Sequence, residues 1–418
     1  MENWLKRTLE NYQPVNDWLA SKREASLAAL KNESWPTRKT EAWKYTPVTA
    51  IEKSEFELNR AIPSIQEAGL PELETIDIVF VNGQVSQLPE DLPEGVTISS
   101  LENASAKEQQ WALAQFNRIK PESHYFGLVN DVLASSGVLI DISPDYKLTC
   151  PIRLVNRITE NQEAHSRHLV RLGKGSEVTI IEHSIGGDPS FNTHISEYDI
   201  DEYAVLTHYK LATQQGEAIS INGCHFNLQK NSKLLSYLIG FGSKLTRLDY
   251  DVRHLGRDSY ALLNGFYLTD AKEHFDLHSN FEHTSVNGIT KTRTKGLIAG
   301  ESHAVFNGRI HIHPGAPKTA AEMNNRNLLL SHKAEIDTKP ELEIYTDDVQ
   351  CAHGATISQI DPEMLYYMTS RGIDHMRALE ILNFGFVNEM LEELPHSSIG
   401  EWLAIATGER LKKVELNG

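Results

Sequence analysis

The chain has little cysteine, no long apolar run, and fewer basic than acidic residues. Its 418 residues include three cysteines, Cys150, Cys224 and Cys351, which are odd in number and far apart. A disulfide framework is therefore not expected. An all-cysteine iron-sulfur site uses four thiolates, so this chain alone lacks the ligands for one. No stretch approaches the roughly 20 apolar residues that a membrane span requires.

The charge balance excludes one large class of partner. The sequence holds 57 Asp and Glu against 40 Lys and Arg, a formal net charge of −17. Sequence-independent nucleic-acid binding needs clustered basic side chains at the phosphates, so no nucleic-acid partner is predicted. The N-terminus, Met1 to Arg7, lacks the apolar segment of a secretory signal. These features predict a cytoplasmic protein with no membrane partner.

The first third of the chain reads as mixed α and β. Residues 1–70 are predicted to be largely helical, because apolar residues recur there at helical spacing. Residues 76–81 are predicted to form a strand, and Asn82-Gly83 a turn after it. Residues 104–119 are expected to form another helix, which Pro121 ends.

From about Tyr125 the pattern changes to many short strands separated by Gly, Pro, Asn and Asp. Strands this short and numerous, over about 235 residues, fit a sandwich, a barrel or a β-solenoid. A sandwich favours hairpin turns of the Asn-Gly type. Four such pairs occur and could be hairpin turns: Asn222-Gly223, Asn264-Gly265, Asn287-Gly288 and Asn307-Gly308. The steady cadence of strand and loop suits a solenoid instead.

The last segment returns to helix. Asp361 is a good N-cap and Pro362 suits the first helical position. Asp374 can cap a second helix that ends near Pro395, and a third is predicted over 399–411. Such a small bundle has little core of its own. It is expected to pack on its own β domain or on a partner.

Cys351 and His353 are the leading candidates for metal ligands. One residue separates them, so on a strand both side chains would project from the same face. A thiolate and a neutral imidazole suit iron or zinc, but two ligands are too few for a closed site. A half-site completed by another subunit is the economical interpretation. The alternative is a buried cysteine beside a hydrogen-bonded histidine.

Other candidates lie close by in the sequence. Asp347 and Asp348 could be iron ligands or carboxylates behind them, or could cap a turn. His311 and His313 alternate by two and share a face, so they could bind iron in transit or form a histidine ladder. No nucleotide site is predicted. Residues 173–176 and 240–244 are rich in glycine, but neither fits the P-loop pattern, and both are expected to be turns.

Three stretches of sequence carry a family resemblance. The longest is E-x-x-T-K-P-x-L-E-I-Y-x-D-D-V-x-C-x-H-G-A-T over residues 335–356, and S-R-G-I follows at 370–373. Residues 43–46 read W-K-Y-T, within a segment that could bind an anion or be a turn pinned by Trp43 and Tyr45. Together these closely resemble the SufD branch of the SufB/SufD family of iron-sulfur cluster assembly proteins. Gly354 stands where the SufB pattern has an acidic residue.

The resemblance implies a mainly β fold with a right-handed parallel β-helix over 125–360. An α/β region, 1–124, would precede it, and a small helical domain, 361–418, would follow. It implies a non-catalytic subunit of a SufB-SufC-SufD type scaffold, and no enzyme. His353 and Cys351 would lie at the interface with a SufB-type subunit and share iron or a transient cluster with it. A SufC-type ATPase would bind the C-terminal helices and supply ATP hydrolysis, and the isolated chain could form a homodimer.

Two other classes of function stay open. Many parallel β-helices are enzymes that act on acidic polysaccharides, but the sequence has no groove-like cluster of Arg and Lys and no secretion signal. An iron-binding protein that uses His311, His313 and His353 is the other alternative.

Overall fold

Two facing β-sheets form the centre of the molecule. The computed structural model describes residues 3–414 except 11, 13, 16, 59–69, 71 and 123. One sheet contains β1 (Ile76–Val81), β2 (Gln84–Gln87), β5 (Ile152–Arg157), β7 (Glu177–Ile185), β9 (Val205–Ala212), β11 (Lys233–Phe241), β13 (Tyr260–Thr269), β15 (Ile289–Ile298), β17 (Ala320–Leu329) and β19 (Gln350–Gln359). The other contains β3 (Val96–Ser100), β4 (Ser136–Ile142), β6 (Glu163–Leu172), β8 (Ser190–Ile200), β10 (Ala218–Leu228), β12 (Leu245–His254), β14 (His274–His283), β16 (His303–Ile312) and β18 (Glu335–Ile344).

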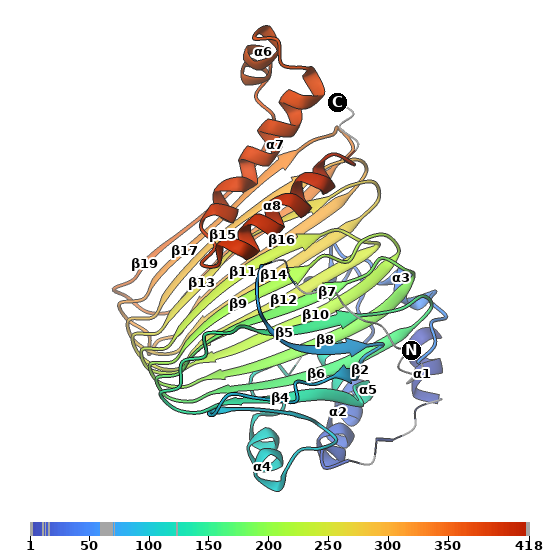
Figure 1. Ribbon diagram of the computed structural model, residues 1–418, viewed down its shortest axis with the longest axis vertical. Coiled ribbons are helices and arrows are strands. Elements are labelled where there is room, and N and C mark those ends of the chain that lie inside the picture. Colours follow the sequence, from blue (N-terminus) through green and yellow to red (C-terminus); the bar gives the residue numbers. More distant parts are fainter. Residues whose placement is uncertain are drawn as a thin grey trace.

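The chain winds through these sheets as a parallel β-solenoid (Figure 1). From β4 to β19 successive strands enter the two sheets alternately, so sixteen strands at two per coil make eight coils. Each strand pairs in parallel with the strand one coil away. Lys233, for example, lies opposite Val205 and Tyr260, steps of 28 and 27 residues. The prediction of a mainly β protein with a parallel β-helix core is confirmed.

The main hydrophobic core fills the space between the two sheets. Side chains alternate along each strand, so every second residue points inward and meets its counterparts from neighbouring coils. The rings of Tyr198 and Phe226, one coil apart, stack with centroids 4.8 Å apart. Ile310 and Ile312 are fully buried in the same core. Because each large apolar side chain contributes about 1.5–3 kcal/mol when buried, these inward stripes hold the coils together.

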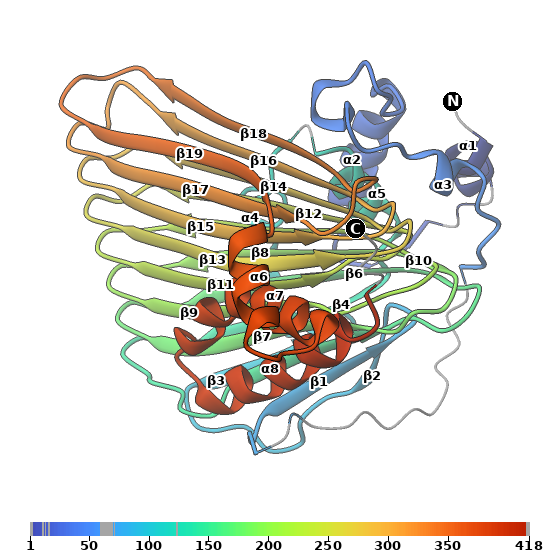
Figure 2. The same ribbon diagram turned by 90° about the horizontal axis from the view of Figure 1, so that it is seen from above.

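Helices from the two ends of the chain cover opposite outer faces of the solenoid (Figures 1 and 2). The N-terminal helices α2 (Ala20–Asn32) and α5 (Tyr125–Leu133) lie against the nine-stranded sheet, whose Phe191 and Ile221 share a core with them. The C-terminal helices α7 (His375–Glu392) and α8 (Ser397–Leu411) lie against the ten-stranded sheet. Both sheets are therefore buried on two faces over much of their length.

The N-terminal region is joined to the solenoid through its strands. β1 pairs in parallel with β5, and β3 pairs antiparallel with β4, so each extends one sheet. Asn82 and Gly83 have φ values of 51° and 73° and form the predicted turn between β1 and β2. The helices here are α1 (Asn3–Glu10), α2, the short 3-10 helix η1 (Glu41–Trp43), α3 (Thr49–Glu52) and α4 (Ala106–Gln115). The helical prediction for 59–69 lies outside the described residues.

The expectation of short strands from Tyr125 onward is wrong for its first residues. Residues Tyr125–Leu133 form helix α5, and all nine are buried. A short apolar run between turn signals has no periodicity that separates a buried helix from a buried strand. The strand pattern itself begins at Ser136, the first residue of β4.

None of the four Asn-Gly pairs forms a hairpin turn, because the strands on either side of Asn287-Gly288, β14 and β15, belong to different sheets. Asn222-Gly223, Asn264-Gly265 and Asn307-Gly308 lie inside β10, β13 and β16. In this register a Cβ at Gly265 would clash with the carbonyl of Leu238 on the neighbouring strand, so the glycine permits the close approach of two coils. Only Asn287 lies in a turn with positive φ, 59°.

The C-terminal segment has the three helices expected from its caps. α6 (Pro362–Ser370) begins after Asp361, whose side chain accepts a hydrogen bond from the Glu363 N–H. Asp374 accepts from Met376 and Arg377 at the start of α7. α7 and α8 pack on the solenoid, whereas α6 has no buried residue and stands away from the sheets (Figure 1). None of the helices in the described part of the chain has the length and apolar character needed to cross a membrane.

Candidate functional site at the open end of the solenoid

The last coil of the solenoid, made of β18 and β19, has no further strand on its outer side. These strands end the two sheets, and Figure 2 shows them side by side at one end of the molecule. Their edge backbone groups face outward, a surface that favours pairing with another chain. The coil also exposes large apolar side chains: Ile344 is 41% exposed, Tyr345 60% and Ile357 50%. We call this surface the open end.

Cys351 and His353 both point toward the inside of the solenoid at the open end. In the parallel ladder Cys351 lies opposite Ala321 and His353 opposite Met323, and both partners on β17 are buried in the main core. Cys351 packs against that core and is half-buried, whereas His353 is exposed because no coil lies beyond it. The prediction that the two side chains share one face of a strand agrees with this geometry.

The pair is chemically available but incomplete. Burial raises the pKa of the Cys351 thiol, a shift partly offset by a backbone hydrogen bond from Ala321, so a metal would have to displace its proton. Within the described chain the His353 imidazole makes no hydrogen bond or ion pair, so nothing competes for its lone pair. Neither residue belongs to a group of three His, Cys, Asp or Glu among the described residues whose ligand atoms lie within 4.8 Å of one another.

Asp347 and Asp348 lie in the turn that joins β18 to β19. Asp348 has a φ of 59°, and its carbonyl accepts a hydrogen bond of 2.6 Å from the Lys318 N–H. Aspartate tolerates this left-handed conformation, so the turn accounts for its presence there. Both aspartates are exposed, and neither joins a three-ligand group in the part of the chain that the structure describes. A role in metal binding stays a prediction for both.

The W-K-Y-T segment is held against the outer face of the nine-stranded sheet. The Arg247 guanidinium lies 3.9 Å from the centroid of the buried Trp43 ring and donates to the carbonyl of Ala42. Thr46 donates to Asp276 at 2.6 Å. Lys339 of β18 reaches Glu41 at 2.5 Å, so the segment also contacts the last coil. These contacts favour the interpretation as a pinned turn.

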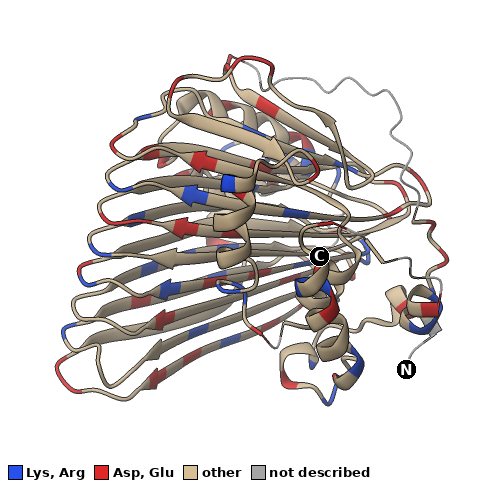
Figure 3. Ribbon diagram, turned by 90° about the horizontal axis from the view of Figure 1, so that it is seen from below, with Lys and Arg blue, Asp and Glu red and all other residues tan. Residues whose placement is uncertain are grey.

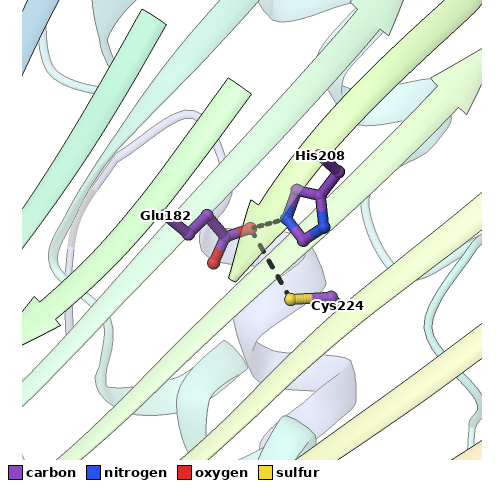
Figure 4. Close-up of side chains that lie close together, drawn as sticks. All are labelled: Glu182, His208 and Cys224. Atoms are coloured by element: carbon purple, nitrogen blue, oxygen red, sulfur yellow. Dashed lines mark hydrogen bonds and ion pairs between the residues drawn. The ribbon is translucent and has the colours of Figure 1, made fainter. Parts of the chain in front are cut away.

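A buried polar cluster inside the solenoid is absent from the sequence-based prediction. Glu182, His208 and Cys224 come from β7, β9 and β10 and converge in the core (Figure 4). Glu182 also pairs with Lys210 at 2.6 Å and accepts from Tyr198 at 2.6 Å. Because these residues are 16 to 42 positions apart, only the coil register brings them together. Polar residues at inward strand positions are the sequence signal that could have indicated the cluster.

The electrostatics of this cluster favour a structural role. Despite burial, Lys210 and His208 hold the pKa of Glu182 well below its usual range, while burial and the Glu182 charge raise the pKa of Cys224 well above its own. The Cys224 thiol is therefore protonated at neutral pH and is no ready metal ligand. The carboxylate already has its hydrogen-bond partners. The arrangement is a satisfied network rather than an open site.

The glycine-rich stretches at 173–176 and 240–244 are followed by strands β7 and β12, and neither opens a helix. Gly175, with a φ of 69°, lies in a turn between strands. Acidic and basic residues are intermixed along the turns of the solenoid rather than gathered by sign (Figure 3). His311 and His313, which were predicted to share a face, stack with ring centroids 4.0 Å apart.

Comparison with known families gives two matches that together cover most of the chain. The family described as SUF system FeS cluster assembly, SufBD core domain, matches residues 155–386, and the SufBD protein N-terminal region matches residues 8–154. The first match takes in the strands from β6 to β19 and reaches into α7.

Individual relatives agree with these matches. The chain is 29% identical to the iron-sulfur cluster assembly protein SufD of Escherichia coli (strain K12), over 92% of this chain and 91% of that protein. It is 28% identical to Protein ABCI7, chloroplastic, of Arabidopsis thaliana, over 90% of this chain and 83% of that one. A SufBD family protein of Synechocystis is 26% identical over 91% and 88% of the two chains. The open end, with Cys351 and His353, lies within the residues that match the SufBD core domain.

Proposed function

The chain belongs to the SufBD family of iron-sulfur cluster assembly proteins, and from this premise we propose that it is a non-catalytic subunit of a SufB-SufC-SufD type scaffold complex. In this proposal it aids iron acquisition and cluster formation at its contact with a SufB-type subunit. The observation that carries the proposal is the open end, where the inward-pointing Cys351 and His353 have a coil on one side only.

The open end supports an interface with a related solenoid. It offers two unpaired strand edges and exposed apolar side chains, including Ile344 and Ile357, which a partner of the same architecture could cover. Cys351 and His353 supply two ligands, so the cargo iron or nascent cluster would take its remaining ligands from the partner. In the absence of that partner a second copy of this chain could cover the same surface and form a homodimer.

The C-terminal helices are the proposed docking surface for a SufC-type ATPase. α6 and the start of α7 expose large apolar residues at Met364, Tyr366, Tyr367 and Met376. The other half of α7 is tied to the solenoid, since Lys295 pairs with Glu389 at 2.9 Å and Arg293 pairs with Glu393. Movement of an ATPase bound at α6 would therefore pass to the sheet and on to the open end.

The family matches also bear on the alternatives. They name iron-sulfur cluster assembly, which does not favour an enzyme that acts on polysaccharides. We place the protein in the cytoplasm, as a bacterial-type assembly factor would be, although one relative bears a chloroplastic name. In this proposal iron or a transient cluster is the cargo of the complex, and the nucleotide binds to the ATPase partner.

The proposal is tested first at His353. The chain is co-expressed with SufB-type and SufC-type partners, and iron and sulfide in the purified complex are measured for wild type and His353→Ala. We expect His353→Ala to lower cluster content several-fold while the three subunits still co-purify, because His353 is exposed and supports no fold contact. His332→Ala is the matched control, since His332 is also exposed but lies outside the open end. Normal cluster content in His353→Ala would contradict the site.

Docking at α6 is tested without disturbing the solenoid. The double variant Tyr366→Ser/Tyr367→Ser removes two side chains that are 74% and 59% exposed. We expect it to release the SufC-type subunit and retain the SufB-type subunit, as measured by light scattering of the co-purified complex. Removing the whole segment after Ile360 would be less informative, because α7 and α8 cover a core of the ten-stranded sheet. Retention of both partners by the variant would exclude this surface.

A further inference from the structure

A second group of metal-binding side chains lies on the outer face of the nine-stranded sheet. It consists of Glu282 on β14, His311 on β16 and His313 directly after β16. Glu282 and His311 are opposite each other in the parallel ladder. Ile310 and Ile312 are buried in the main core, so the alternating residues His311 and His313 point away from it. One ligand atom from each of the three residues lies within 4.8 Å of the others.

The two imidazoles suit coordination. Their rings are nearly parallel, 7° apart, with centroids separated by 4.0 Å. Burial, His313 and Arg309 together lower the pKa of His311. His313 Nε2 is buried and has no hydrogen-bond partner within the described chain. A bound metal ion would give this nitrogen a partner; without one it is a buried polar atom that makes no hydrogen bond, which costs free energy.

A positive side chain already lies beside the group. Arg309 donates to both carboxylate oxygens of Glu343 at 2.8 Å and approaches His311 Nδ1 at 2.5 Å. Its guanidinium also lies 3.6 Å from Glu282. Arg309 therefore balances carboxylates that a cation would otherwise neutralise, and a divalent ion bound here would compete with it.

We propose that Glu282, His311 and His313 form a binding site for a divalent first-row transition metal ion. Two histidines and one carboxylate are a ligand set used for Fe(II) and related ions, whereas Mg²⁺ and Ca²⁺ prefer oxygen ligands throughout. Three protein ligands leave positions open on the ion, unlike the closed four-ligand sites that serve structure alone. The site is separate from Cys351 and His353, and its loading does not depend on the proposed function, because no partner subunit is required.

The test uses the full-length chain with Cys351→Ser and His353→Asn, which removes the two leading candidate ligands at the open end. Co(II), and Fe(II) under anaerobic conditions, are titrated calorimetrically into this background. We expect a single ion to bind, and His313→Asn or Glu282→Gln to weaken binding at least about tenfold, a loss that even outer-sphere changes produce in metal sites. His332→Asn, which changes an exposed histidine outside the group, is expected to leave the affinity unchanged.

Two further readouts separate the site from nonspecific binding. The Co(II) complex should show ligand-field bands of a nitrogen and oxygen site without thiolate charge transfer. Arg309→Gln should tighten binding, because the competing guanidinium is gone and Glu343 is released. Thermal melting of each variant checks that the fold is intact. Absence of binding to the folded background chain, or equal loss with His332→Asn, would overturn the proposal.

Discussion

The middle of the solenoid and its open end use the same strand positions for opposite purposes. Around Glu182 the inward side chains are sealed by coils on both sides, and the carboxylate has Lys210 and Tyr198 as partners. At the open end the inward side chains Cys351 and His353 have a coil on one side only. An inward residue is therefore structural where a coil follows and available for binding where none does.

The sharpest test of the sealed middle is the buried Lys210–Glu182 pair. Both side chains are fully buried, so Lys210→Met leaves an uncompensated carboxylate, and we expect unfolding free energy to fall by about 3–5 kcal/mol. The matched control is Lys244→Met, which breaks a pair with Glu217 that also joins neighbouring coils but is 44% and 62% exposed. That change should cost less than about 1 kcal/mol. Urea unfolding of both variants measures the difference, and equal costs would refute it.

A second test compares equivalent apolar positions one coil apart. Ile312 and Ile344 are opposite each other in β16 and β18, but Ile312 is fully buried and Ile344 is 41% exposed. Ile312→Ala is expected to lose about 2–5 kcal/mol of unfolding free energy through the cavity that it leaves. Ile344→Ala should change the free energy of unfolding of the isolated chain by only about 0.5 kcal/mol.

The same pair also tests the interface. If the open end binds a partner, Ile344→Ala should weaken association with the SufB-type subunit, measured by light scattering of the co-expressed proteins. A large stability loss from Ile344→Ala in the isolated chain would mean that this position is covered from within the chain.

Acid should destabilise the fold through buried histidines before the buried carboxylates titrate. Burial lowers the pKa of His168 and of His274 to about 4 and that of His183 to about 3, from an ordinary 6.5. Between pH 6.5 and these values the unfolded chain binds more protons, so stability falls as the pH falls, by about 1.4 kcal/mol per pH unit for each histidine. The Glu182 carboxylate, whose pKa is lowered, loses its contribution only below its ordinary 4.5.

The measurement is urea unfolding from pH 7 to pH 5, with His168→Gln as the variant expected to reduce the slope. A flat profile over this range would show that the buried imidazoles do not control acid stability.

Local features of the molecule were predictable from sequence, and features that depend on coil register were not. The caps at Asp361 and Asp374, and the shared face of Cys351 and His353, involve residues within three positions of each other. The parallel winding of the strands rested on family resemblance, because strand pattern alone also fits a sandwich.

The features that the sequence did not predict have physical causes. The Asn-Gly pairs signal turns only where positive φ is needed, and at Gly265 the glycine serves close packing of Leu238 instead. The Glu182 and Glu282 groups join residues about one coil apart, up to 42 positions in sequence, so they follow from the pitch of the solenoid rather than from any motif. The shared face of His311 and His313 follows from their spacing, but only the strand register shows that Glu282 lies beside them.

The placement of α7 has a mechanical consequence. Its 18 residues make a rod about 27 Å long at 1.5 Å per residue. Its C-terminal half is clamped to β15 by Lys295, while its N-terminal half leads out to the exposed α6. α7 is thus fixed to the ten-stranded sheet at one end and continues into the exposed α6 at the other. A small tilt of the α6 end would therefore be transmitted through α7 to the stacked coils.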